Sequence, residues 1–300
     1  MSPAIGLVGA PTSAGAFAPG QEDAPAALRD AGLVTALRAA GLQVTDRGDT
    51  PRFRWRVDHD DPRAMNAAAV ADGIRAVGAH VEDALRAGQC VLVLGGDCTV
   101  GAGTVAGAVA ADLQPRLLYF DMHADLNRPH TVPDGALDWT GVAHMLDVDG
   151  ADERLLAALP RRPLLADDDV VLFAIRTEGT TAGERKVIQA RGLDLITLDD
   201  VAADPATAAH RAAELATAGG RRFLVHFDVD VVDFSDVPLS ENTGRGIGLT
   251  FDAALAALEV LVAHEAHLGL TVTELNPHHG AEDGSDVARL AARLARAVSA

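Results

Sequence analysis

Short runs of apolar, often branched residues alternate with alanine-rich stretches of helical period, and this alternation constrains the fold more than any other feature. Eight runs are candidate strands: Ile5–Gly9, Leu42–Thr45, Cys90–Leu94, Leu117–Asp121, Val170–Ile175, Leu193–Leu198, Phe223–Asp228 and Leu268–Glu274. Candidate helices lie near residues 24–40, 65–87, 100–111, 141–158, 181–191, 205–218, 251–265 and 283–298. Strands that are apolar on both faces and alternate with helices are typical of a parallel sheet covered by helices on both sides. We therefore predict an α/β fold with three layers, α/β/α, and an eight-stranded parallel sheet in a single domain over residues 1–300.

Composition excludes several classes of protein. The chain carries 43 acidic and 25 basic side chains, a formal charge of −18, and this negative field repels phosphate backbones and anionic lipid. Because no apolar run approaches the roughly 20 residues that span a bilayer, we expect neither nucleic acid nor a membrane as a partner. Two cysteines, Cys90 and Cys98, are too few for a disulfide framework, and the N-terminal residues do not form a secretion signal. We therefore expect a cytoplasmic protein.

Carboxylates gather where two of the predicted strands end. Residues 121–125 read DMHAD and residues 228–233 read DVDVVD, and each motif opens one of the two longest segments without clear periodicity, 122–140 and 229–249. Ligand sites of open parallel sheets lie beyond the carboxyl ends of the strands. In an extended chain, residues i and i+2 point to one face, so Asp121 and His123 converge, and Asp125 joins them once the chain turns.

Buried carboxylate pairs of this kind repel one another unless a positive charge lies between them. Carboxylates with imidazole suit divalent ions of the Mn²⁺ or Zn²⁺ type, and two bridging carboxylates indicate a two-metal site that deprotonates a shared water. The alternative is that these aspartates only cap the helices that follow.

Two further strand ends carry GGDC, residues 95–98, and ELNP, residues 274–277. Together with DMHAD and HFDVDVVD, in this order and spacing, they resemble the ureohydrolase superfamily of arginases, agmatinases and formimidoylglutamases. The N-terminal stretch from Val8 to Leu33 is also similar to the opening of arginases, so the resemblance covers nearly the whole chain. It implies an arginase-like α/β/α fold, two Mn²⁺ ions, hydrolysis of a guanidine or amidine carbon in a small cationic substrate, and a homo-oligomer, trimer or hexamer.

The resemblance assigns six metal ligands: Cys98, Asp121, His123, Asp125, Asp228 and Asp230. It implies that Asp121 and Asp228 bridge the two ions, that Cys98 and Asp125 complete one ion, and that His123 and Asp230 complete the other. Asp125 is also implied as a catalytic residue that accepts and relays a proton.

The resemblance further implies three substrate contacts. Glu274 would face the cationic head group as a catalytic and substrate-binding residue, since a carboxylate holds a planar guanidinium through paired, charge-assisted hydrogen bonds. Asn127 matches a position that helps hold the far end of the substrate. Asp138 occupies, by a count without gaps, the place of the family's catalytic histidine, and we assign it to substrate binding.

Cys98 is the first departure from the family pattern, because it replaces a metal-binding histidine. A thiolate is softer than imidazole and adds negative charge, so it favours Zn²⁺ and weakens Mn²⁺ binding. The alternative is that Cys98 is a small buried residue beside an empty or weak metal site.

The other departures concern histidine and proline positions. Either His130 or His144 could replace the missing catalytic histidine by swinging in, or both could be surface or packing residues. Phe234 replaces a proline, and the loop that follows is altered. His226 replaces a serine before DVDVVD, either as a partner of the metal ligands or as a satisfied core histidine.

The hydroxyarginine amidinohydrolases of antibiotic pathways differ from arginase in the same two ways: a cysteine replaces the first metal-binding histidine, and the later histidine is missing. The sequence resembles this branch more than an ordinary arginase. We therefore expect a hydrolase that acts on a hydroxyarginine- or arginine-like substrate and releases urea or a substituted urea with an amine. Three other readings compete with it. The first is a dinucleotide-binding oxidoreductase, but the chain has no complete G-x-G-x-x-G motif. The second is a cysteine hydrolase, but the carboxylates near Cys98 would raise the pKa of its thiol. The third is a scaffold protein that keeps the fold without hydrolysis.

Overall fold

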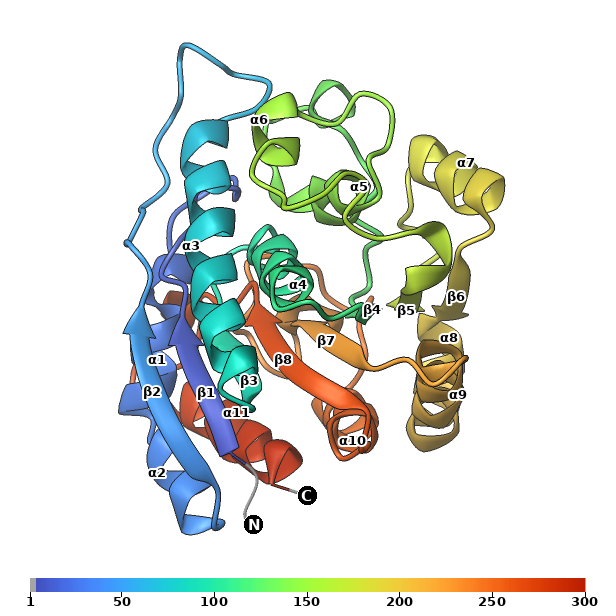
Figure 1. Cartoon of the computed structure of the whole chain (residues 1–300). Coiled ribbons are helices and arrows are strands. Elements are labelled where there is room, and N and C mark those ends of the chain that lie inside the picture. The colour runs from blue at the N-terminus through green and yellow to red at the C-terminus, as the bar shows by residue number, and fades with distance from the viewer. Residues whose placement is uncertain (1–3, 300) are drawn as a thin grey trace.

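The computed structural model describes residues 4–299 (Figure 1). Its strands are β1 (Ala4–Gly9), β2 (Gln43–Asp49), β3 (Cys90–Leu94), β4 (Arg116–Phe120), β5 (Val170–Ile175), β6 (Asp194–Thr197), β7 (Phe223–Asp228) and β8 (His267–Thr273). They form one sheet in the order β2-β1-β3-β8-β7-β4-β5-β6, and every neighbouring pair is parallel. The predicted eight-stranded parallel sheet is confirmed. The single-domain organisation predicted for residues 1–300 stays a prediction.

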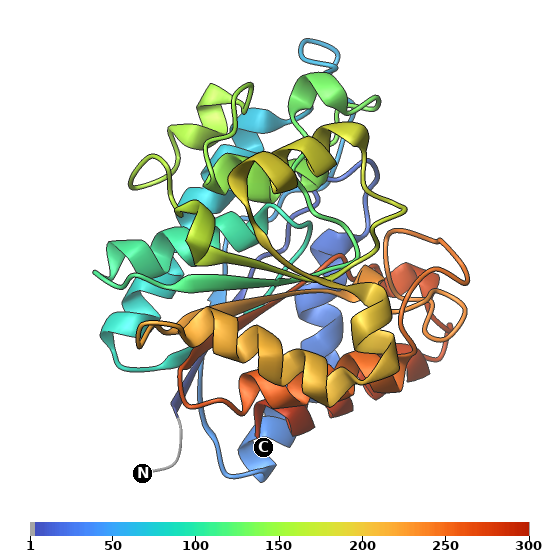
Figure 2. The same ribbon diagram turned by 90° about the vertical axis from the view of Figure 1, so that its right-hand side faces the viewer.

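Helices cover both faces of the sheet, which confirms the three layers (Figure 2). The helices are α1 (Ala24–Asp30), α2 (Leu33–Ala39), α3 (Ala67–Arg86), α4 (Val100–Ala110), α5 (Gly141–Met145), α6 (Glu153–Leu156), α7 (Ala182–Arg191), α8 (Leu198–Ala203), α9 (Pro205–Thr217), α10 (Phe251–Val262) and α11 (Ser285–Val298). Single 3-10 turns lie at Gln21–Asp23, Pro129–Thr131, Asp138–Thr140, Asp167–Asp169, Val229–Val231 and Pro277–His279. One layer holds α3 to α7, and the other holds α1, α2 and α8 to α11.

The two layers bury separate apolar cores because successive strand residues point to opposite faces. On β4, Phe120 belongs to the core beneath α9 to α11, whereas Tyr119 belongs to the core beneath α3 and α4. Every residue of β5 and β7 is buried. The two edge strands differ. Every residue of β2 is exposed or half-buried, and its sequence is correspondingly polar, while three of the four residues of β6 are half-buried.

Several predicted elements differ in extent from the structure. The strand predicted over Leu42–Thr45 continues to Asp49 as β2. The helix predicted over 24–40 is two helices, because Gly32 between them adopts a left-handed φ of 86°. The helix predicted over 141–158 is likewise split into α5 and α6. The strand predicted to reach Leu198 ends at Thr197, whose side chain accepts the backbone N–H of Asp200 and so begins α8 as its N-cap.

The four central strands, β3, β8, β7 and β4, carry the motifs. Phe120 on β4 pairs with Phe227 on β7, so Asp121 and Asp228, one residue later on each strand, end side by side. Asp228 in turn pairs with Thr273 on β8, directly before Glu274. The sheet therefore places these side chains close together at the carboxyl ends of its strands. Within residues 4–299, no helix has both the length and the apolar character that crossing a membrane requires.

Candidate metal centre and active site

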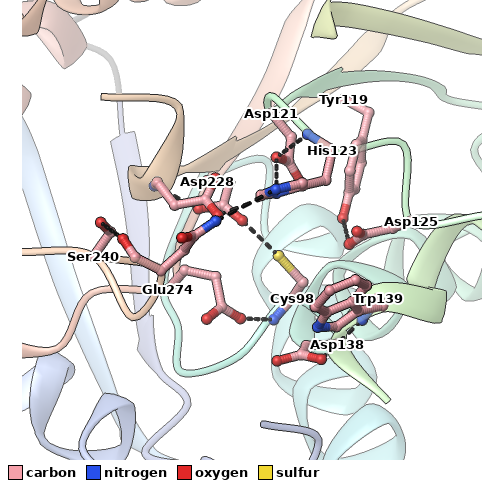
Figure 3. A network of polar contacts seen from close by, with 12 residues as sticks. Cys98, Tyr119, Asp121, His123, Asp125, Asp138, Trp139, Asp228, Ser240 and Glu274 are labelled. Atoms are coloured by element: carbon pink, nitrogen blue, oxygen red, sulfur yellow. Dashed lines mark hydrogen bonds and ion pairs between the residues drawn. The ribbon is translucent and has the colours of Figure 1, made fainter. Parts of the chain in front are cut away.

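A cavity of about 520 Å³ opens over the carboxyl ends of the central strands. Figure 3 shows how the polar side chains there, among them Cys98, Asp228 and Glu274, point toward one another. Its acidic lining residues are Asp125, Asp134, Asp138, Asp228, Asp230, Glu241 and Glu274. The others are Phe17, Cys98, His123, Trp139, Asn242, Thr243 and His279, so half of the lining is acidic and no lining residue is arginine or lysine. Such a cavity favours a positively charged ligand.

The first group of donor atoms lies at the floor of the cavity. It comprises Cys98, Asp121, His226 and Asp228, which each offer one ligand atom within 4.8 Å of the others, and all four side chains are buried. The Cys98 thiol donates to Oδ2 of Asp228 at 3.0 Å, and Nε2 of His226 lies 3.4 Å from the same sulfur. Burial lowers the pKa of His226 to about 3, so its imidazole is neutral and able to coordinate a cation.

The second group comprises Asp121, His123 and Asp230 under the same criterion. Nδ1 of His123 lies 3.1 Å from Oδ2 of Asp230 and 3.4 Å from Oδ1 of Asp121. Asp121 belongs to both groups, as expected of a bridging ligand, whereas Asp228 belongs only to the first. The bridging role assigned to Asp228 stays a prediction.

Two buried carboxylate oxygens in these groups, Oδ2 of Asp121 and Oδ1 of Asp230, have no hydrogen-bond partner. Burial, together with the charge of Asp230, raises the pKa of Asp121 to about 6 and that of Asp228 well above its usual range. A buried carboxylate oxygen without a donor is costly, and a divalent ion supplies the missing positive charge. The carboxylate, imidazole and thiol donors at this site therefore fit the metal ions that the sequence predicts.

Asp125 lies outside both groups of donor atoms. Its backbone adopts a left-handed φ of 48°, and the Tyr119 hydroxyl donates to its Oδ2. Burial and the neighbouring Asp121 raise the pKa of Asp125 well above its usual range. Asp125 still lines the cavity, so its carboxyl group can meet a bound substrate. Two roles of Asp125 therefore stay predictions: metal ligand and proton relay.

Glu274 is a second site residue in the left-handed region, with φ of 59°. Its Oε1 accepts the backbone N–H of Cys98 at 2.7 Å, and its Oε2 accepts Nε2 of Gln21 at 2.9 Å. Burial and the charge of Asp97 raise its pKa well above its usual range. These donors hold the carboxylate in place where it lines the cavity.

The structure separates the other two predicted substrate residues. Asp138 lines the cavity, where its Oδ1 accepts the backbone N–H of Trp139 at 2.9 Å. Asn127 is buried but does not line the cavity, because its Oδ1 accepts the hydroxyls of Thr131 at 3.3 Å and Thr181 at 3.2 Å. Asn127 thus ties a turn in the 129–131 segment to the start of α7, and its contact with a substrate stays a prediction.

Neither alternative histidine lines this cavity. His144 is buried, with Nδ1 2.7 Å from the carbonyl of Thr140 and Nε2 accepting the backbone N–H of Asp152 at 2.8 Å. The ring of His130 lies beside Gly150. His144 is therefore a packing residue. Phe234 is also buried, with its ring 5.9 Å from that of His279, which itself lines the cavity.

Sequence reasoning missed several residues of this site. The sequence leaves His226 either as a partner of the metal ligands or as a core histidine, and the structure puts it among the donor atoms. Tyr119 belongs to no motif, and Gln21 lies within the arginase-like stretch from Val8 to Leu33, which assigned it no role. Phe17 lies on a loop and Trp139 in the single turn Asp138–Thr140, and they remain 43% and 40% exposed although both line the cavity. Side chains that line a cavity from irregular segments leave no periodic pattern in a sequence.

Comparisons with known proteins support this picture. The model of the Arginase family matches residues 3–300. An arginase from Agrobacterium fabrum is 31% identical over 281 residues, which cover 90% of this chain and 83% of that protein. The structure of an arginase from Bacillus caldovelox matches with a TM-score of 0.86 at 26% identity, covering 99% of this chain and 98% of the other. Proclavaminate amidino hydrolase from Streptomyces clavuligerus shares the fold with a TM-score of 0.72 at 20% identity, covering 99% and 92%.

Proposed function

The chain belongs to the arginase family, and from this premise we propose that it is a metal-dependent hydrolase that cleaves a C–N bond of a guanidino or amidino group. The superfamily predicted from GGDC, DMHAD, HFDVDVVD and TELNP is confirmed. The observation that supports hydrolysis best is the pair of donor groups that share Asp121 at the floor of an acidic cavity.

The proposed cofactor is a pair of divalent ions, Mn²⁺ in general and Zn²⁺ where Cys98 contributes. Cys98, Asp121 and Asp228 would hold one ion, and His123 and Asp230 the other together with Asp121. When bound, such ions supply Lewis acidity that lowers the pKa of a water molecule until it is a nucleophile at neutral pH. The two orphaned carboxylate oxygens of Asp121 and Asp230 support this proposal.

The chain's own side chains would bind and orient the substrate. Glu274, held by the N–H of Cys98 and by Gln21, would receive the planar cationic head at the cavity floor. Tyr119 occupies Oδ2 of Asp125, which leaves Oδ1 to accept a proton and pass it to the departing amine. Addition of water to the central carbon and cleavage of one C–N bond would give urea or a substituted urea with an amine.

We extend the proposal to a modified head group such as an N-hydroxyguanidine. Cys98 changes the metal site and Asp138 stands where the family pattern has histidine, so both the ion and the proton donor near the scissile nitrogen differ from those of ordinary arginases. Asp138 lines the cavity and has an oxygen that accepts only from the Trp139 N–H. It could therefore hydrogen-bond a substituent on the head group.

Product analysis tests this proposal. Protein loaded with Mn²⁺ or Zn²⁺ is expected to release hydroxyurea from hydroxyarginine faster than urea from arginine, agmatine or guanidinobutyrate, as measured by chromatography. Preference for plain arginine would rule out the modified head group but leave hydrolysis standing. No metal uptake and no product from any of the four compounds would favour the scaffold alternative instead.

A Glu274→Gln variant tests the binding of the head group. The amide keeps the size of the side chain but carries no charge, and one charged hydrogen bond contributes about 1.5–3 kcal/mol. We therefore expect kcat/KM to fall by on the order of 100-fold, with most of the loss in KM if the contact is made equally in the bound and reacting states. Metal content should stay unchanged, because Glu274 is in neither donor group.

We also propose that the protein acts in the cytoplasm as a homo-oligomer, a trimer or a hexamer. The family resemblance supports an oligomer, and the acidic composition supports a small cationic substrate over nucleic acid. Mass photometry of the purified protein would distinguish a trimer from a hexamer, and a monomer would contradict the proposal.

A further inference from the structure

His226 has an environment that packing alone does not explain. It lies within the buried strand β7, two residues before Asp228, so the two side chains project to the same face of the sheet. Its Nε2 lies 3.4 Å from the sulfur of Cys98 and 3.1 Å from the hydroxyl of Thr273. Its Nδ1 is buried without a hydrogen-bond partner. All of the polar contacts of this ring are therefore made by Nε2, the nitrogen that faces the donor group.

The imidazole is also held in position by two close neighbours. One face stacks on Tyr119, with the ring centroids 4.2 Å apart and the planes 11° from parallel. On α4, a methyl group at Gly101 would lie only 2.5 Å from Nδ1, so a glycine is needed there for the ring to fit. Because Tyr119 packs on one ring face and the backbone of Gly101 lies close to Nδ1, the imidazole cannot move far without disturbing the core.

We propose that His226 is a metal ligand, and that Cys98, His226, Asp121 and Asp228 form a four-donor site that selects a zinc-type ion over Mn²⁺. This inference rests on the proposed function, since it takes a metal centre at this edge of the sheet as given. A tetrahedral zinc ion with the usual bond lengths places a thiolate sulfur and an imidazole nitrogen about 3.5 Å apart. The observed separation is 3.4 Å.

The thiol must lose its proton to act as a ligand. In the structure Cys98 donates to Oδ2 of Asp228 at 3.0 Å. Binding of a zinc-type ion would replace the S–H bond by a sulfur–metal bond and release one proton to solvent. Thiolate and imidazole are ligands that prefer zinc, whereas the second group, with Asp121, Asp230 and His123, has the donors of a manganese site. The two ions of the centre are therefore expected to differ.

The chain supplies a matched control for this arrangement. At the opposite end of the sheet, Cys90 and His267 form a second cysteine–histidine contact, with the sulfur 3.8 Å from Nδ1. His267 also has a buried nitrogen without a partner. No carboxylate joins this pair in the described groups that could hold an ion. Removing His267 thus tests the loss of a strand histidine apart from the loss of a ligand.

Cobalt(II) titration of the purified full-length protein tests the proposal. Wild-type protein and His267→Gln are expected to bind Co²⁺ with a near-ultraviolet thiolate-to-cobalt absorption band, which Cys98→Ser abolishes. His226→Gln is expected to weaken Co²⁺ and Zn²⁺ binding at this site by more than about 100-fold, because a partner that merely orients a ligand typically costs about 10–100-fold. Mn²⁺ binding at the second site should change little.

A second variant and a second measurement guard against misfolding. Gly101→Ala keeps His226 but crowds its ring, so it should also weaken Co²⁺ binding while circular dichroism stays that of the wild type. X-ray absorption of the zinc-loaded wild type should show sulfur at about 2.3 Å together with imidazole. An unchanged cobalt spectrum and affinity in His226→Gln, or zinc without sulfur in the wild type, would overturn the proposal. These readouts do not depend on turnover, so failure of hydrolysis and failure of this inference are separate results.

Discussion

Replacing Asp228 by asparagine is expected to remove one metal ion and to lower kcat/KM by on the order of 1,000-fold. Asp228 belongs to the first donor group, and its Oδ2 lies 3.0 Å from the sulfur of Cys98. The amide keeps the shape of the side chain but carries no charge for the ion. Loss of several kcal/mol of charge stabilisation corresponds to about three powers of ten in rate. Elemental analysis and a product assay measure the two effects.

Asp233→Asn is the matched control, since Asp233 belongs to the same DVDVVD motif. Its carboxylate accepts backbone N–H groups from Ser235 at 2.8 Å, Ile247 at 2.7 Å and Gly248 at 3.1 Å. Although partial burial opposes ionisation, these bonds lower its pKa to about 2. Asp233→Asn should keep both ions but lose about 1–2 kcal/mol of unfolding free energy. Full metal content in Asp228→Asn, or metal loss in Asp233→Asn, would contradict the assignment.

Metal-free protein is expected to lose stability as the pH rises from about 4 through the folded-state pKa of Asp121 at about 6. Burial and neighbouring carboxylates raise the pKa of Asp121 from 3.8 to about 6, and burial raises those of Asp125, Asp228 and Glu274 well above their usual range. A carboxyl group with a raised folded-state pKa binds its proton more tightly in the folded protein. Its contribution to stability is complete below the unfolded pKa and is lost as the pH rises through the folded pKa. For Asp121 this amounts to about 3 kcal/mol.

Metal ions should reverse this loss, because they bind the folded chain and replace the protons. At a free concentration of about 1,000 times the dissociation constant, an ion adds about 4 kcal/mol. Urea unfolding with chelator and with Zn²⁺ or Mn²⁺ should therefore give free energies that diverge as the pH rises. Surface groups such as Glu153, whose pKa Arg162 lowers, are common to both samples and cancel. A difference that does not change with pH would count against the buried carboxylate cluster.

The fold was predictable because a central parallel strand is apolar on both faces, which leaves a clear mark in sequence. Runs such as Val170–Ile175 and Phe223–Asp228 appear as strands with the same bounds. Helix boundaries were less predictable, since they depend on single residues. Gly32 divides one predicted helix through its left-handed φ, and Thr197 begins a helix where a strand was expected to continue.

The part of the candidate site that directly follows paired strands was predictable. Asp121 and Asp228 end side by side because their strands pair, and strand-end motifs are visible in a sequence. Contacts set by a turn are different. Asp125 lies outside the donor groups, and its carboxylate accepts a hydrogen bond from the Tyr119 hydroxyl. No spacing rule predicts that hydrogen bond. A metal-binding histidine and a packed core histidine look the same in a sequence. Only the distance from His226 to the sulfur of Cys98 distinguishes the two interpretations.

The left-handed backbone at Asp125 and Glu274 links the stability of the fold to the acidity of the cavity. A residue with a Cβ atom costs about 1–3 kcal/mol in that region, and glycine avoids most of this cost. Both carboxylates line the cavity. Glycine at either position would therefore relieve backbone strain and remove an acidic group from the cavity in a single change.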